Sequence, residues 1–441
     1  MATEITRRSV LRGSLLAAGA VAFGSTLAGC TAGGSGGSGG KSTVTVMWQS
    51  AEFTPAYIKD FEKKNPGITI KFIEFDQNRL NAMLTAGNPP DVVRGSPSAN
   101  LFARQLASPL DDYIAKSKVI HAADLEAVND LWRWDGKKLG SGKRYGLIKD
   151  FSPDNTIWQN EAMFTQAGVT PLSTSTPASW DDLLDTAKKL KAGGILMPLG
   201  IEWQWGVSGI VANMIEQQGG QLFNDSLTKA QLDTPEGIRA IQWLIDYGKA
   251  GLGPTSLNPL TDGQDAPTFV AGKMAMTKDG FWFGANFQAT DGATVGKTAS
   301  LAPAPTFGKR ISPVLGAVGG WIPSASKNKD GAWSVIEYFM GGQPAIDRAK
   351  SGWGLPALTS LWKYIPADEP YQKQAIALAK EEVTYVKPGQ DSPYIDGTAW
   401  NGDLDKALQA GIQGSQTAEQ IAQSVQKQMN VLLAQGKDQL G

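Results

Sequence analysis

The stretch 42–75, STVTVMWQSAEFTPAYIKDFEKKNPGITIKFIEF, decides the class of the fold. Residues 42–49 alternate apolar and polar side chains, which is typical of a β-strand. Residues 55–67 carry apolar side chains at helical spacing and end in Asn-Pro-Gly, which stops a helix. Residues 68–75 resume the strand pattern. A strand, a helix and a strand in succession predict parallel pairing of the strands, and therefore an α/β fold.

Helix signals recur along the rest of the chain. Ser179, Thr234 and Thr417 stand at the N-cap position of segments with helical apolar spacing, and Gln420 completes a capping box with Thr417. Residues 326–342 repeat apolar residues on one helical face in the same way. Three tryptophans on these helical faces are expected to belong to the core: Trp180, Trp243 and Trp333.

The composition excludes several classes of function. The 441 residues include one histidine, His121, and one cysteine, so a His/Cys zinc site and Cys–His catalysis are excluded, and we expect no metal and no cofactor. Without residues 1–29 the chain carries 38 basic and 41 acidic side chains, a net charge of −3. This net charge does not indicate a nucleic-acid-binding protein, which would carry an excess of basic side chains. A chain of this length is expected to form two lobes.

Residues 1–29 have the pattern of a secretion signal. Arg7 and Arg8 precede an uncharged apolar run that is too short to span a bilayer comfortably. The paired arginines resemble a twin-arginine signal, and the sequence LAGC that ends at Cys30 resembles the bacterial lipobox, in which the cysteine is acylated. Residues 30–42 are rich in Gly and Ser and are expected to form a flexible tether. The alternative is a buried amino-terminal helix in which Cys30 is a small apolar residue.

Several motifs, in this order, resemble those of the extracellular solute-binding proteins of ABC importers, in particular the sugar- and oligosaccharide-binding group that includes the maltose-binding proteins. They extend over nearly the whole chain after the tether. The motifs on which the resemblance depends are NPPDVV (88–93), YGLIKD (145–150), SWDDLLDTAKKL (179–190), DTPEGIRAIQWL (233–244), FVAGKMAMTKDGFW (269–282), GAVGGWIPSASKNKDGAWSVIEYF (316–339) and SGWGLPAL (351–358).

The resemblance implies a two-lobed periplasmic-binding-protein-like fold with a hinge and a cleft between the lobes. Residues 43–149 with 304–356 would form lobe one, and residues 150–303 with 357–441 would form lobe two. It also implies capture of a sugar or oligosaccharide in the cleft and delivery to the permease subunits of an importer, without catalysis. We expect a monomer, anchored by the lipid on Cys30 to the extracellular face of the cell membrane. Ile148 departs from the family, in which proline often follows Tyr-Gly-Leu at the first crossing.

A sugar presents apolar faces and a ring of hydroxyl groups, which suit aromatic planes and polar side chains respectively. Candidate ligand-binding residues are therefore tryptophans beside glycine or polar residues in loops, and polar residues after the first strand and the first crossing. Glu202 lies beside two of these tryptophans, and the alternative for Trp282 is a packing role between the lobes. The candidates are Trp48, Ser50, Glu52, Asp150, Asn155, Trp203, Trp205, Asp279, Trp282, Gly320, Trp321, Trp353 and Trp400.

Two other functions fit parts of the pattern. A pair of carboxylates beside aromatic side chains also occurs in glycoside hydrolases, where one acts as the general acid. Tryptophans with several acidic residues also suit a cationic solute such as a polyamine, through cation–π contact and charge pairing.

The lipobox generates a prediction about anchoring. The Cys30→Ala variant should be released into the medium, because the acylated side chain is lost, while its affinity for solute stays unchanged. Fractionation of cells and medium with an antibody measures the distribution. A variant that stays with the membrane through an uncleaved apolar segment would contradict the lipoprotein hypothesis.

Overall fold

The computed structural model describes residues 41–261, 263–289, 291–314, 317–397 and 399–440, without the side chains of Gln204 and Trp205. The predicted signal segment, Cys30 and the tether up to residue 40 lie outside these residues. Strand β1 (Ser42–Trp48), helix α1 (Pro55–Lys64) and strand β2 (Ile68–Glu74) follow one another, and β1 pairs with β2 in parallel along its whole length. The strand–helix–strand unit predicted from residues 42–75 is confirmed.

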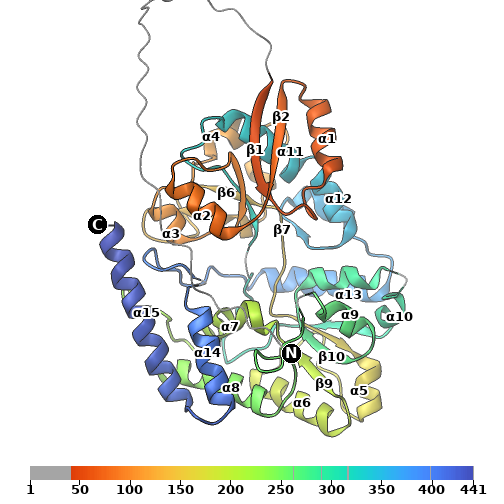
Figure 1. The fold of residues 1–441 in the computed structure, drawn as a ribbon. Helices are drawn as coiled ribbons and strands as arrows, with labels where there is room; N and C mark the ends of the chain where they lie inside the picture. Colours follow the sequence, from red (N-terminus) through yellow and green to blue (C-terminus); the bar gives the residue numbers. More distant parts are fainter. Residues whose placement is uncertain (1–40, 262, 290, 315–316, 398, 441) are drawn as a thin grey trace, which may run out of the picture. The chain divides into compact units, whose positions relative to one another are not determined.

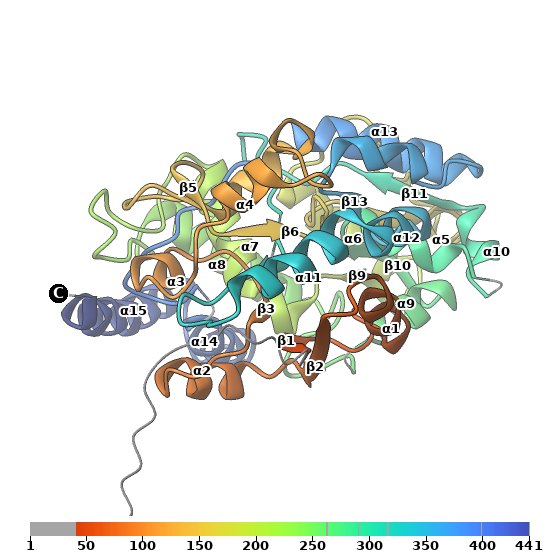
Figure 2. The ribbon, with the colours of Figure 1, turned by 90° about the horizontal axis from the view of Figure 1, so that it is seen from above.

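The first sheet contains five strands in the order β2-β1-β3-β12-β6. It adds to β1 and β2 the strands β3 (Val92–Gly95), β12 (Gly319–Trp321) and β6 (Gly146–Ile148). Strand β12 is antiparallel to both of its neighbours, so a segment far along the chain lies inside this sheet. Helix α11 (Lys329–Gly341) packs against β1 and β3 (Figure 2). Val44, Val46 and Phe61 share one apolar core with Ile336 and Phe339 of α11.

The second sheet contains four strands in the order β11-β8-β10-β9. These are β8 (Ile157–Asn160), β9 (Met197–Gly200), β10 (Met274–Lys278) and β11 (Ala299–Ala302), and only the β9–β10 pair is parallel. Besides α5 (Glu161–Ala167), five helices contribute to the apolar core on this sheet (Figure 1). They are α6 (Trp180–Ala192), α7 (Trp203–Gln217), α8 (Pro235–Lys249), α14 (Asn401–Ile412) and α15 (Ala418–Leu440).

The chain passes between the two sheets three times. It passes from β6 to β8, from β11 to β12, and again after β12 toward the helices that pack on the second sheet. The first passage contains β7 (Asp150–Phe151) and the third contains β13 (Leu355–Pro356). These two short strands pair with each other in antiparallel orientation, so two of the three passages lie side by side.

The predicted helix starts are confirmed where local hydrogen bonds determine them. The Ser179 hydroxyl accepts from the Asp182 backbone N–H at 2.9 Å. Thr417 and Gln420 form the reciprocal bonds of a capping box, at 3.0 and 3.2 Å. On α6 the predicted apolar face is buried throughout: Trp180, Leu183, Leu184, Ala187 and Leu190.

The remaining elements connect these layers, and none of the helices in the described residues is both long enough and apolar enough to cross a membrane. The remaining helices and strands are α2 (Gln77–Thr85), α3 (Ala99–Ala103), α4 (Asp111–Lys116), η1 (Ala122–Asp124), η2 (Ala127–Trp132), β4 (Arg133–Trp134), β5 (Lys143–Arg144), α9 (Asp265–Val270), η3 (Phe281–Phe287), α10 (Ala293–Gly296), α12 (Gln343–Ser351), η4 (Thr359–Tyr364) and α13 (Pro370–Val383).

Trp243 provides a test of the core beneath the second sheet. Its ring is buried, lies against Tyr247 and Trp180, and donates a hydrogen bond to the Trp180 carbonyl at 2.7 Å. The Trp243→Ala variant should lose about 3 to 5 kcal/mol of unfolding free energy, because it leaves a cavity. Denaturant unfolding measures this loss. Leu196→Ala is the control, since Leu196 is 91% exposed, and it should change stability by less than about 0.5 kcal/mol.

Candidate functional site

A cavity of about 490 Å³ lies at the carboxyl ends of the parallel strands β9 and β10. In α/β proteins this edge of a sheet is where ligands bind. Gly200, the last residue of β9, packs closely against Met274 in the wall, since a Cβ atom there would lie 2.8 Å from Met274 Sδ. The polar side chains of the wall are Glu202, Thr255, Thr261, Asp265, Thr277 and Asn286.

Two tryptophans form the aromatic part of the cavity wall. The rings of Trp282 and Trp353 lie 5.1 Å apart and are inclined by 48°. Trp282 belongs to η3, directly after β10, whereas Trp353 follows Gly352, the left-handed residue that ends α12. Trp353 is 45% exposed, which is unusual for so large an apolar side chain. The pair therefore offers aromatic surface to a ligand in the cavity.

Buried charges lie behind the polar wall. The Lys278 ammonium group is completely buried and lies 3.9 Å from Glu202 Oε2, and it donates to the Asp154 carbonyl at 3.2 Å. Burial raises the pKa of Glu202, and the charge of Lys278 opposes this effect. Burial raises the pKa of Asp279 well above its usual range, and the carboxylates of Glu202 and Asp265 raise it further. The described part of the chain contains no His, Cys, Asp and Glu cluster arranged to hold a metal ion.

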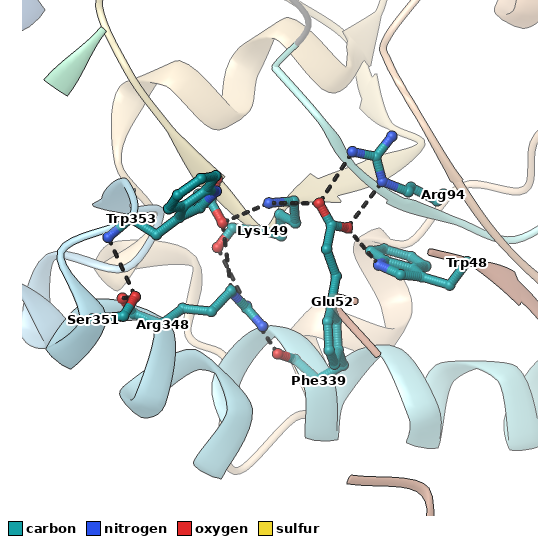
Figure 3. A network of polar contacts seen from close by, with 9 residues as sticks. Trp48, Glu52, Arg94, Lys149, Phe339, Arg348, Ser351 and Trp353 are labelled. Atoms are coloured by element: carbon teal, nitrogen blue, oxygen red, sulfur yellow. Dashed lines mark hydrogen bonds and ion pairs between the residues drawn. The ribbon is translucent and has the colours of Figure 1, made fainter. Parts of the chain in front are cut away.

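A second network of charges lies at the carboxyl end of β1 (Figure 3). Glu52 accepts hydrogen bonds from Trp48 Nε1 at 2.8 Å and from Arg94 Nε at 2.9 Å, and it lies 3.2 Å from Lys149 Nζ. Lys149 also pairs with Asp150 at 2.8 Å. Burial by itself would raise the pKa of Glu52, but Arg94 and Lys149 outweigh it and lower the pKa to about 2. Glu52 is therefore ionised and fully engaged within the protein.

The structure brings some of the predicted site residues together at the cavity. Trp203, Trp282 and Trp353 line it. Asp279 is buried just behind the wall, beside Glu202. Asn155 is also buried, and its side chain accepts from Lys278 at 3.4 Å and donates to Asn213 at 3.0 Å.

The other predicted residues lie elsewhere. Trp48 packs in the core of the first sheet against Phe339, and Gly320 provides the space for its ring. Trp321 and Trp400 are buried in apolar clusters, and Ser50 is exposed. Glu52 and Asp150 belong to the charge network of Figure 3. Trp205 belongs to α7, but its side chain is outside the described atoms.

Sequence reasoning missed several charged residues that the structure places at these two centres. Lys278 ends a strand whose five residues are all buried, and a lysine in such a strand is a signal that could have been used. Arg94 likewise lies on a short strand between apolar residues. Asp265 and Arg348 lie on helices, and their sequence context does not distinguish them from surface charges.

Comparisons with known proteins agree with this architecture. The model of a family described as bacterial extracellular solute-binding protein matches residues 48–341. A binding protein of Brucella abortus is 27% identical over 323 residues, which cover 68% of this chain and 72% of the relative.

Solved structures agree as well. An ABC substrate-binding protein of Listeria monocytogenes in complex with cycloalternan has a TM-score of 0.73 at 20% identity, covering 89% of this chain and 99% of that one. A solute-binding protein of Thermotoga lettingae bound with α-D-tagatose has a TM-score of 0.71 at 22% identity, covering 89% and 100%. The lacto-N-biose-binding protein of Bifidobacterium longum has a TM-score of 0.70 at 18% identity, covering 91% and 99%. The predicted two-lobed α/β fold is confirmed.

The network around Glu52 generates a prediction about acid stability. Its pKa is about 2 in the folded protein and 4.5 as a free side chain, so the stabilisation is complete above about pH 4.5 and is lost as the pH falls toward 2. The loss should be about 3 kcal/mol. The Glu52→Gln variant should be less stable at neutral pH and should show a flatter acid limb, measured by denaturant unfolding across pH.

Glu74→Gln is the matched control, because the Glu74 carboxylate is exposed and accepts from the Ser50 backbone N–H. Its acid limb should follow that of the parent. If the Glu52→Gln and Glu74→Gln curves were the same, the network would not be the source of the acid dependence.

Proposed function

The chain belongs to the family of bacterial extracellular solute-binding proteins, since the family model matches more than half of it, and we propose from this premise that it captures a sugar or oligosaccharide for an ABC importer. The cavity at the ends of β9 and β10 is the proposed binding site. The observation that carries the proposal is the pair Trp282 and Trp353, which shares the cavity wall with carboxylate, amide and hydroxyl groups.

The chemistry of the cavity matches a carbohydrate. Aromatic rings contact the C–H faces of a sugar ring, and Glu202, Asp265 and Asn286 supply acceptors and donors for its hydroxyl groups. The cavity has the volume of a small-molecule site. The ligands named for the similar structures, cycloalternan, α-D-tagatose and lacto-N-biose, are all carbohydrates.

The arrangement of the chain suggests how occupancy is signalled. We assign residues 43–149 with 304–356 to lobe one and residues 150–303 with 357–441 to lobe two. Trp353 lies on the third passage between the sheets, two residues before β13, whereas the rest of the cavity wall belongs to lobe two. A solute that contacts Trp353 and lobe two together favours one arrangement of the passage by its differential affinity.

The proposal extends to the place where the protein works. Export under the signal of residues 1–29 and acylation of Cys30 would hold it at the extracellular face of the membrane. There it would pass solute to the permease subunits of its importer. It acts by binding, and the solute leaves it chemically unchanged.

Truncating either cavity tryptophan tests the site. The Trp282→Ala and Trp353→Ala variants should bind solute at least about tenfold more weakly, because each loses a stacking surface worth on the order of 1 kcal/mol in addition to its buried area. A thermal-shift screen over cycloalternan, maltose, lacto-N-biose, D-tagatose and D-mannitol identifies the solute, and calorimetry then measures the affinities.

Two controls accompany this experiment. Trp282→Phe keeps an aromatic face and should retain more affinity than Trp282→Ala. Chromatography of the recovered solute should show it intact. Normal binding by both alanine variants would place the site elsewhere, and steady product formation would favour a hydrolase.

A further inference from the structure

The carboxyl groups of Glu202 and Asp279 meet behind the wall of the cavity. Glu202 lines the cavity, and its side chain is in hydrogen-bonding contact with Asp279, which is completely buried at the end of β10. The Thr277 hydroxyl donates to Asp279 Oδ2. Among the described residues, Asp279 Oδ1 has no N–H or O–H donor. A buried carboxylate oxygen is rarely left without a donor.

A proton held between the two carboxyl groups explains the missing donor. Two ionised carboxylates in contact away from water repel each other, and in such pairs one proton is held by both groups. A proton on Glu202 or Asp279 supplies the missing donor. Burial raises the pKa of Asp279 well above its usual range, and the charge of Glu202 acts in the same direction.

The charged groups around Glu202 and Asp279 favour one proton bound to the pair. Lys278 is the nearest cation, 3.9 Å from Glu202, and it is shared with the Asp154 carbonyl and Asn155. Asp265, from α9, adds a further negative charge and raises the pKa of both groups. On α14, Asp405 is engaged by Trp203 and Ser256, at 2.6 and 2.7 Å.

The backbone conformation of Glu202 also supports a functional role for this residue. Its φ and ψ angles are 45° and 46°, the left-handed conformation that favours glycine. A glutamate there is strained, and strained backbone is found more often at functional sites than elsewhere. The strained residue is the one whose carboxyl group lies between the cavity and Asp279.

We propose that Glu202 and Asp279 share one proton in the solute-free protein at neutral pH, and that the shared proton makes Glu202 select an uncharged hydroxyl group of the solute over an ammonium group. The part of the proposal about the choice of solute rests on the proposed function, whereas the part about the shared proton does not. With the proton present, the pair carries one negative charge, which Lys278 balances, so Asp265 is left as the one uncompensated carboxylate among these four groups. A hydroxyl group can donate to and accept from such a pair. An ammonium group favours the doubly ionised pair and would displace the proton.

Infrared difference spectroscopy of the solute-free protein tests the proton directly. At about pH 7 the parent should show the C=O band of a protonated carboxyl group that is absent from both Asp279→Asn and Glu202→Gln. Using two variants keeps the test valid if one fails to fold. Glu216→Gln is the matched control, because Glu216 is a half-buried carboxyl group near the opposite end of α7 whose pKa is also raised by desolvation. Loss of this band in the control alone, or in none of the variants, overturns the proposal.

Calorimetry in buffers of different ionisation enthalpy tests the selectivity. Binding of the tightest saccharide from the thermal-shift screen should release no proton at about pH 7, and spermidine should bind more weakly than that saccharide. Release of about one proton with the saccharide, or tighter binding of spermidine, overturns the selectivity. If no saccharide binds, the proposed function fails, but the infrared result still decides whether the proton is shared.

Discussion

The antiparallel pairing of β7 with β13 holds together two of the three segments in which the chain passes between its sheets. Buried charges hold this pair in place. Asp150, on β7, lies 2.8 Å from Lys149 Nζ and 3.6 Å from Arg348 Nε, and Lys149 continues the network to Glu52 after β1 (Figure 3). Removing one partner would leave an uncompensated charge in a buried place, which costs more than the pair itself contributes. The charge network therefore binds these passages to the first sheet.

This constraint reaches the cavity through Trp353. Helix α12 ends at Gly352, whose left-handed conformation turns the chain toward β13, and Trp353 lies in this turn. Its ring meets that of Trp282, which the end of β10 positions. The aromatic wall is thus built from a passage and from the second sheet together, and a ligand that lies against both rings contacts both parts.

The two buried charge centres show how local charge balance determines the state of a carboxyl group. Glu52 lies beside the cations Arg94 and Lys149, and they lower its pKa although it is buried. Asp279 faces Glu202 and Asp265 with one lysine nearby, and burial with repulsion raises its pKa. The same functional group is ionised in one place and inclined to hold a proton in the other, because the number of neighbouring cations differs. The first centre is suited to holding structure, and the second lies at the proposed binding site.

The sequence by itself determined the features that depend on neighbouring residues. Alternation and helical spacing predicted the strand–helix–strand unit at 42–75 and the buried face of α6, and side-chain caps predicted where helices begin, because these signals act within a few residues. The tertiary structure decided which tryptophans meet a cavity. Trp48, Trp321 and Trp353 all lie beside polar or glycine residues in the sequence, yet the first two are buried and the third is exposed. Burial and the contact of Glu202 with Asp279 depend on segments far apart in the chain, whose approach no local pattern encodes.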